Sequence, residues 1–182
     1  MILPLAICQV DQPKVGNTPA LPFYDWKACP FEGCSCRRWI AQKEIVVYDT
    51  WKQNRQPIAQ LSKGDSVIGV TGVVITFRPG VIRLDRDLPE QKLKRGETIL
   101  TYTYRGEGFS AVWLKGLYYS EFDISFAQWP DGSGCGGAHC AGTYVDLGEK
   151  VWWVEVKLKS GRNAWVNMNT AVFDGALMHW PV

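Results

Sequence analysis

Apolar and polar residues alternate most clearly near the C-terminus. The apolar positions of this stretch are Trp152, Val154, Val156 and Leu158. A period of two predicts a β-strand with one buried face. Ser160-Gly161 predicts a tight turn, and a second strand is expected from Asn163. This part of the chain is therefore expected to form a β-hairpin.

Other short apolar runs, separated by turn residues, predict further strands. They lie at residues 44–48, 58–61, 66–77, 81–84, 98–104, 109–114 and 117–122. Gly69 and Gly72 interrupt the longest run, which indicates bulges or tight curvature of the kind that a small closed barrel needs. No stretch keeps a helical period for more than about three turns. The pattern predicts an all-β fold.

One short motif occurs twice, and each copy precedes a predicted strand. Leu61-Ser-Lys-Gly64-Asp65 matches Leu93-Lys-Arg-Gly96-Glu97, which indicates two tandem units. We expect a first barrel at residues 39–92 and a second at residues 93–182. A Gly- and Cys-rich insertion is expected in the second barrel at about 127–149. Residues 1–38 follow neither period and predict an extended, Cys-containing N-terminal arm.

Composition narrows the possible partners. The 182 residues are 46% hydrophobic and 21% charged, which excludes intrinsic disorder, and the net charge of +2 gives no argument for nucleic acid or an anionic membrane. The basic residues Lys92, Lys94, Arg95 and Arg105, with Tyr102 and Tyr104, are better explained as solvated turn residues than as a nucleic-acid groove. The apolar N-terminal run is too short to span a bilayer. We expect no nucleic-acid partner and no transmembrane segment.

The cysteines form clusters, at Cys8, then Cys29, Cys34 and Cys36, then Cys135 and Cys140. Six cysteines in a chain of this length indicate an oxidising compartment. We expect a Cys135–Cys140 disulfide, because the Gly-rich segment between them can fold back, and a pairing of Cys29 with Cys34 or Cys36. A zinc site that also uses His139 is the alternative, but we expect no metal and no cofactor.

The N-terminus contains a sequence that is compared with a lipidation site. Leu5-Ala6-Ile7-Cys8 is similar to a bacterial lipoprotein cleavage site, although Ile7 stands where that site needs a small residue. Lipidation of Cys8 is therefore a lesser alternative to simple secretion.

Several of these motifs together resemble bacterial SH3-like domains. They are the two Gly-Asp/Glu turns, the Val-rich strand after the first turn, and the closing Trp153-Val-Glu-Val, Gly161 and Trp165-Val. The resemblance covers about residues 39–84 and 93–170. Cys29-Pro-Phe-Glu-Gly-Cys34 is similar to the leader of bacterial envelope proteins that carry such domains. The resemblance implies two SH3-like barrels in a non-catalytic module of the kind that often binds cell-wall peptides.

The sequence offers few residues for a catalytic site. The chain has two histidines, His139 and His179, and His139 adjoins Cys140 too closely to act on it. Glu121 and Asp123 could flank a glycosidic bond, but two carboxylates on a solvent-facing strand are a commoner arrangement. We expect no enzyme, with a cell-wall hydrolase or a purely structural assembly subunit as the alternatives.

The aromatic residues offer the better binding candidates. Tyr48 and Trp51 lie where a loop leaves a strand, and three more lie around the Lys115-Gly116 turn: Trp113, Tyr118 and Tyr119. Exposed aromatic side chains on a small barrel form shallow platforms for peptides or sugars. A second group is expected in the barrel core: Trp39, Phe77, Phe109, Trp152 and Trp165. The sequence thus predicts a periplasmic or secreted module that binds cell-wall (peptidoglycan) peptide or an extended protein segment.

Overall fold

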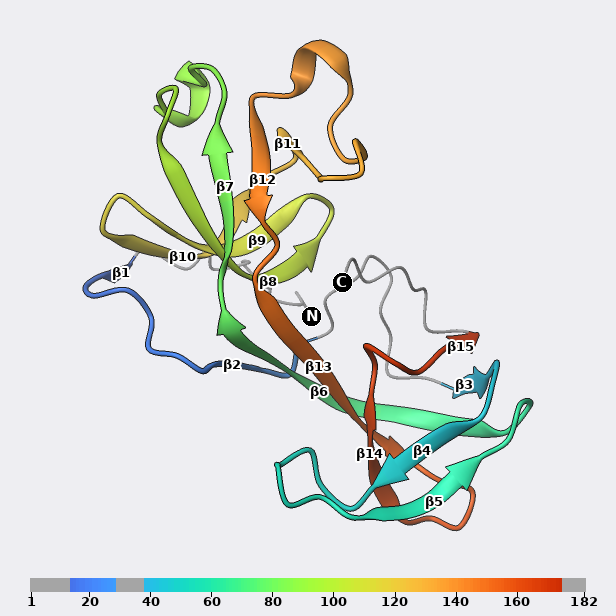
Figure 1. Ribbon diagram of the computed structural model, residues 1–182. Coiled ribbons are helices and arrows are strands. Elements are labelled where there is room, and N and C mark those ends of the chain that lie inside the picture. The colour runs from blue at the N-terminus through green and yellow to red at the C-terminus, as the bar shows by residue number, and fades with distance from the viewer. Residues whose placement is uncertain (1–13, 29–37, 175–182) are drawn as a thin grey trace, which may run out of the picture.

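The computed structural model describes residues 14–28 and 38–174, and in these residues the chain is built from β-strands (Figure 1). The described helices are the two 3-10 turns η1 (Pro89–Gln91) and η2 (Gly137–His139). No helix in the described ranges has the length and hydrophobicity to cross a membrane. The strands form two curled sheets, as expected for two small barrels, and the all-β prediction is confirmed.

The first sheet has eight strands and lies at the bottom of Figure 1. Its order is β15 (Phe173–Asp174), β3 (Arg38–Ala41), β6 (Ser66–Arg78), β13 (Glu149–Lys157), β14 (Asn163–Asn167), β4 (Ile45–Tyr48) and β5 (Pro57–Leu61), with β2 (Phe23–Trp26) on β6. Its described pairings are antiparallel. The hairpin predicted near the C-terminus is β13 and β14, with Val154 opposite Val166.

The second sheet has seven strands. Its order is β1 (Lys14–Val15), β10 (Leu117–Asp123), β9 (Phe109–Leu114), β8 (Thr98–Gly106), β7 (Gly80–Leu84), β12 (Gly142–Asp146) and β11 (Ala127–Gln128). β11 pairs with β12 in parallel, and the other described pairs are antiparallel.

All strands of the second sheet except β1 are inserted in the chain between β6 and β13 of the first. β6 continues into β7 through Pro79, and β12 returns into β13, which pairs with β6 from Glu149 opposite Arg78 to Lys157 opposite Ile68. The division between the sheets therefore does not coincide with the boundary expected at residues 92/93. β7 precedes that boundary but belongs to the second sheet, whereas β13 and β14 follow it and belong to the first. The reason is the long-range β6–β13 pairing.

Each curled sheet encloses its own apolar core. Trp39 and Trp152 fill the first core, with exposed fractions of 2% and 1%, and Ile82, Ile99 and Val112 lie in the second. The register between β6 and β13 slips between Thr71 and Gly69, so the predicted bulge is present. A Cβ on Gly72 would lie 2.8 Å from Trp152 Nε1, which explains why a glycine stands there.

Three residues expected in the core lie elsewhere. Phe77 is 42% exposed, because its neighbour Thr76 is the buried one and donates its hydroxyl to the Tyr102 carbonyl. Phe109 and Trp165 are only partly buried. Successive residues of a strand point to opposite faces, and Ala164 and Val166 occupy the inner face of β14.

The repeated motif forms two turns with the same geometry. A carboxylate oxygen of Asp65 accepts the Ser62 N–H at 2.9 Å, and one of Glu97 accepts the Lys94 N–H at 2.9 Å. Each carboxylate also pairs with a lysine at 3.0 Å, Lys159 for Asp65 and Lys115 for Glu97. The turns precede β6 and β8, so corresponding strands of the two sheets begin in the same way.

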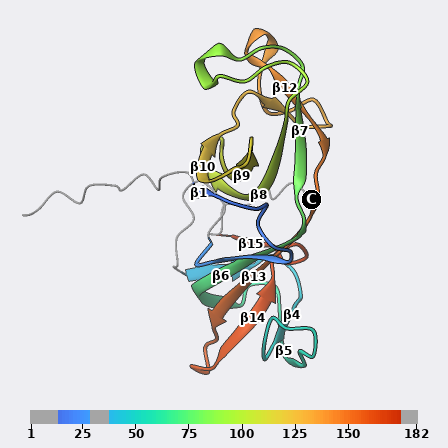
Figure 2. The ribbon, with the colours of Figure 1, turned by 90° about the vertical axis from the view of Figure 1, so that its left-hand side faces the viewer.

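The described part of the predicted arm joins the two sheets. β1 pairs with β10 of the second sheet and β2 with β6 of the first, and Figure 2 shows this segment running from one sheet to the other. Asp25 of β2 forms an ion pair with Arg105 of β8 at 2.8 Å. The remaining residues of the arm, 1–13 and 29–37, lie outside the described residues.

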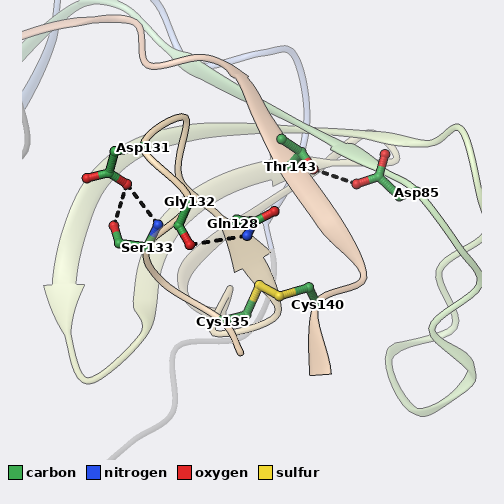
Figure 3. The surroundings of a disulfide bond; sticks show 8 residues. All are labelled: Asp85, Gln128, Asp131, Gly132, Ser133, Cys135, Cys140 and Thr143. Carbon is green, nitrogen blue, oxygen red and sulfur yellow. Dashed lines mark hydrogen bonds between the residues drawn. A yellow bond between two sulfur atoms is a disulfide. The ribbon is translucent and has the colours of Figure 1, made fainter. Parts of the chain in front are cut away.

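The Gly- and Cys-rich insertion contains the predicted Cys135–Cys140 disulfide, with Cα atoms 5.2 Å apart (Figure 3). The preceding turn is held by Asp131, whose carboxylate accepts the backbone N–H of Ser133 at 2.9 Å and its hydroxyl at 2.6 Å. The prediction of a Cys135–Cys140 disulfide is confirmed. The predicted pairing of Cys29 with Cys34 or Cys36, and the lipidation site Cys8, lie outside the described residues.

Candidate aromatic binding surface

Aromatic side chains gather on the outer face of the first sheet, opposite its core. Trp26 of β2 and Trp153 of β13 both pair in register with Val73 of β6, from its two sides. One step along, Tyr24 and Val151 flank Ile75 in the same manner. Side chains in register on neighbouring strands share one face of the sheet, so these residues form two adjacent rows.

The loop between β4 and β5 adds a third aromatic layer. The ring centroid of Trp51 lies 5.7 Å from that of Tyr24, 5.5 Å from that of Trp26 and 6.5 Å from that of Trp165. The loop is closed by its own hydrogen bonds, because Asp49 accepts the Gln56 N–H through its carboxylate at 2.8 Å and donates its own N–H to the Gln56 carbonyl at 3.1 Å. Trp51 therefore lies against the sheet on a closed loop.

Arg55 from the same loop places a positive charge beside the aromatic rings. Its guanidinium carbon lies 4.9 Å from the ring centroid of Trp153 and 5.5 Å from that of Tyr48. A cation over an aromatic face at this distance is attracted by the ring quadrupole. Tyr48 and Trp153 also make an edge contact, with centroids 5.7 Å apart. These contacts hold the end of the loop on the sheet.

Exposure increases from the base of this cluster to its top. Trp153 is 3% exposed, whereas Tyr24 is 43% and Trp26 is 54% exposed. The rings of Tyr24 and Trp26 are nearly parallel, with an interplanar angle of 15° and centroids 6.5 Å apart. We name the set Tyr24, Trp26, Tyr48, Trp51, Arg55 and Trp165 the aromatic surface. It offers open π-faces, supported from below by packed side chains, on which planar or apolar groups of a ligand can stack.

The structure brings together two of the five aromatic candidates from the sequence. Tyr48 and Trp51 both belong to the aromatic surface. Trp113, Tyr118 and Tyr119 lie on the second sheet, in β9 and β10. The five residues therefore do not form one groove.

The three candidates on the second sheet also differ among themselves. Trp113 pairs in register with Tyr118, whose ring lies 6.0 Å from that of Phe23 in the segment that joins the sheets. Tyr119 points the other way, packs against the second core and contacts Phe122 at 5.3 Å. All three are partly buried.

Sequence reasoning missed Tyr24, Trp26 and Trp165. Tyr24 and Trp26 fall in the segment expected to be an extended arm, although their alternation with Phe23 and Asp25 is the pattern of a short strand. Asp25 is 8% exposed and the residues on either side of it are the exposed ones. For Trp165, the strand context predicts a place in the barrel core, whereas its side chain lies on the outer face of β14.

The described residues contain neither a reactive Cys–His pair nor a cluster that could bind a metal ion. Cys140 is held in the disulfide, so it has no thiolate for His139 to activate. No three His, Cys, Asp or Glu side chains within residues 14–28 and 38–174 gather into a set that could hold a metal ion. Of the basic residues weighed for a nucleic-acid groove, Arg105 is paired with Asp25, and the neighbouring Tyr102 is fully buried.

Comparison with known proteins identifies no relative of this chain. No family model, curated protein or solved structure matches this chain. The resemblance to SH3-like domains therefore rests on the sequence motifs, and the function has to be inferred from the geometry of the aromatic surface.

Proposed function

We propose that this protein is a non-enzymatic module of the bacterial envelope that binds a cell-wall peptide or an extended protein segment on the aromatic surface. The observation that carries the proposal is the position of Trp26, which is 54% exposed although its ring packs against Trp51. An indole held in place but open to solvent loses little further conformational freedom on binding. Aromatic residues of this kind supply much of the binding energy in protein interfaces.

The neighbourhood of β2 favours an extended ligand. β2 pairs with β6 along one edge, and no described strand pairs with its other edge. An extended peptide can add to such an edge by backbone hydrogen bonds while its side chains contact pockets or rings on one face. Tyr24 and Trp26, two residues apart on β2, present their rings on that face. A peptide bound there would reach Trp51 as well.

The location in the envelope is supported by chemistry and by the resemblance. A disulfide such as Cys135–Cys140 is stable in oxidising compartments, which include the periplasm and the cell exterior. The Cys-Pro-Phe-Glu-Gly-Cys motif that is similar to envelope leaders agrees with this location.

The proposal is tested by binding to purified cell-wall sacculi and to soluble stem peptides. We expect the wild-type protein to co-sediment with sacculi, and Trp26→Ala to bind more weakly by about tenfold or more. Trp113→Ala is the matched control, because Trp113 is a partly buried tryptophan of the second sheet, away from the aromatic surface. Equal binding by wild type and Trp26→Ala, or no binding to either probe, would contradict the proposal.

The same samples distinguish binding from hydrolysis. Soluble fragments released from labelled sacculi are measured by mass spectrometry against a heat-inactivated control. We expect no release above that control. Release by the folded protein would favour the cell-wall hydrolase over the binding module.

A further inference from the structure

A cavity of about 190 Å³ lies in the second sheet, where β8 passes the junction of β12 and β13. Its lining includes Thr101, Thr103, Ser110, Trp129, Tyr144 and Lys150. It shares no residue with the aromatic surface. One water molecule needs about 10–15 Å³ of such space, so the cavity is large enough for a small organic molecule.

Lys150 places an uncompensated positive charge in this cavity. Its Nζ donates a hydrogen bond to the Leu147 carbonyl at 2.8 Å, and within the described residues it forms no ion pair. Burial, with a contribution from Arg78, lowers the pKa of Lys150 to about 8. The carboxylate of Asp146 is engaged by Arg78. A buried cation without a counter-charge is costly, and an anionic ligand would supply the missing partner.

The lining also holds two buried hydroxyl groups. Thr101 and Thr103 are 2% and 1% exposed. The hydroxyl of Thr101 lies beside that of Tyr144, and the hydroxyl of Thr103 has no hydrogen-bond partner in the described part of the chain. Buried polar atoms are nearly always satisfied by protein, water or ligand. These hydroxyls can therefore donate to an acceptor that enters the cavity.

The wall of the cavity is aromatic. The rings of Trp129 and Tyr144 stack with centroids 4.4 Å apart and an interplanar angle of 12°. Burial raises the pKa of Tyr144 to about 12, so its hydroxyl stays neutral at physiological pH. Glu149, the exposed lining residue, forms no ion pair with Lys150. The lining thus combines a cation, hydroxyl donors and a flat apolar wall.

We propose that this cavity binds a small organic anion, with its carboxylate on Lys150 and the threonine hydroxyls and its apolar part against the Trp129–Tyr144 stack. The proposal is independent of peptide binding on the aromatic surface, since the two sites share no residues. Charge, hydrogen-bond donors and an apolar wall together favour a carboxylate on a ring over a bare inorganic anion.

The test compares benzoate with benzamide and with inorganic phosphate, using chemical shifts of the ¹⁵N-labelled protein. Benzamide has the shape of benzoate without its charge, and phosphate has charge without a ring. We expect benzoate to shift signals of the cavity residues and to bind about tenfold or more tightly than either of the others. Equal binding of benzamide would contradict the role of Lys150. Equal binding of phosphate would contradict the role of the aromatic wall, and no shift with benzoate up to its solubility limit would overturn the site.

Variants then locate the charge. Lys150→Met should lose the preference for benzoate over benzamide, whereas Lys157→Met, which changes an exposed lysine of the same strand, should keep it. The wild-type protein gives a measurement that does not depend on the folding of a variant. If benzoate binds the protein about tenfold more tightly when Lys150 is charged, saturating benzoate must raise the pKa of Lys150 by about one unit. The titration is followed by NMR of the ε-methylene group of Lys150. An unchanged titration would contradict the proposal.

Discussion

The indole rings of Trp26 and Trp51 lie with their centroids 5.5 Å apart, although one residue belongs to β2 and the other to the loop after β4. These segments do not pair with each other. They meet because β2 pairs with β6 and the β4–β5 loop folds back across β14 and β13 toward β6. The aromatic surface is therefore a product of the whole first sheet.

Trp51→Ala is expected to weaken both ligand binding and the first sheet. Trp51 packs against Tyr24, Trp26 and Trp165 and is itself partly buried. Loss of its ring should cost about 1–3 kcal/mol of binding free energy and about 1–2 kcal/mol of unfolding free energy. Titration calorimetry with a stem peptide and denaturant unfolding measure the two effects.

Trp113→Ala is the comparison for that variant. Trp113 is a partly buried tryptophan on the second sheet, away from the aromatic surface. It should lower stability without changing peptide affinity. A loss of affinity equal to that of Trp51→Ala would show that the ligand contacts the second sheet.

Replacement of the disulfide by Cys135→Ser with Cys140→Ser should loosen the insertion and leave the sheets folded. The bridge closes a short loop, which contributes about 2 kcal/mol by the chain-entropy account. Hydrogen exchange should become faster at residues 129–141, while β6 and β13 keep their protection. Faster exchange throughout the first sheet would contradict a local role.

Asp65 and Glu97 should make stability depend on acid pH. The N–H groups of Ser62 and Lys94, and then the lysines Lys159 and Lys115, lower the pKa of the two carboxyls below their ordinary values. A lowered pKa in the folded state adds stability that is present above the unfolded pKa and is lost as the pH falls through the folded pKa.

Asp65→Asn and Glu97→Gln should each lower the Tm at neutral pH and flatten its fall toward acid pH. Glu90→Gln is the control, because Glu90 is exposed in η1 and makes no hydrogen bond within the described residues. Thermal unfolding between pH 2 and pH 7 measures the slopes. Parallel curves for all variants would contradict the assignment.

Lys150 should make stability rise with pH as well, in the alkaline range. Its pKa is 10.5 in the ordinary case and about 8 here, so the unfolded chain binds more protons between these values and stability rises with pH. The rise relative to Lys150→Met is at most about 3 kcal/mol. The charged or titratable groups near Lys150 are Arg78, Glu149, Tyr102, Tyr104 and Tyr144.

Denaturant unfolding of both proteins at pH 7.5 and pH 9.5 gives the comparison. This range lies below the ordinary pKa of the tyrosines, so the difference between the two proteins reports on the lysine. Equal pH dependence for wild type and Lys150→Met would contradict a buried, uncompensated amine.

Local patterns predict the strands and the hairpin between two neighbouring strands, but not the pairing of strands that are distant in the chain. The alternation of Trp152, Val154 and Val156 predicts β13, and the turn at Ser160-Gly161 predicts its hairpin with β14. The pairing of β13 with β6 joins segments that are separated in the chain by β7 to β12, and no local signal in either strand indicates it. The nested order of the sheets therefore follows from tertiary packing.

The same limit applies to the aromatic surface. Tyr48 and Trp51 are predicted because they end a strand and enter a loop. Trp26 is not, since β2 is short and lies among prolines and glycine. Its exposed ring becomes a candidate only once β2 is placed beside β6.

The central claim, peptide binding at Trp26 and Trp51, is tested most directly by following the indole N–H signals of the ¹⁵N-labelled protein during titration with a cell-wall stem peptide. The signals of Trp26, Trp51 and Trp165 are expected to shift together and to saturate, while those of the buried Trp39 and Trp152 stay in place. Assignment by single Trp→Phe variants identifies each signal. Shifts confined to Trp113, or no shift of any indole at saturating peptide, would contradict the account.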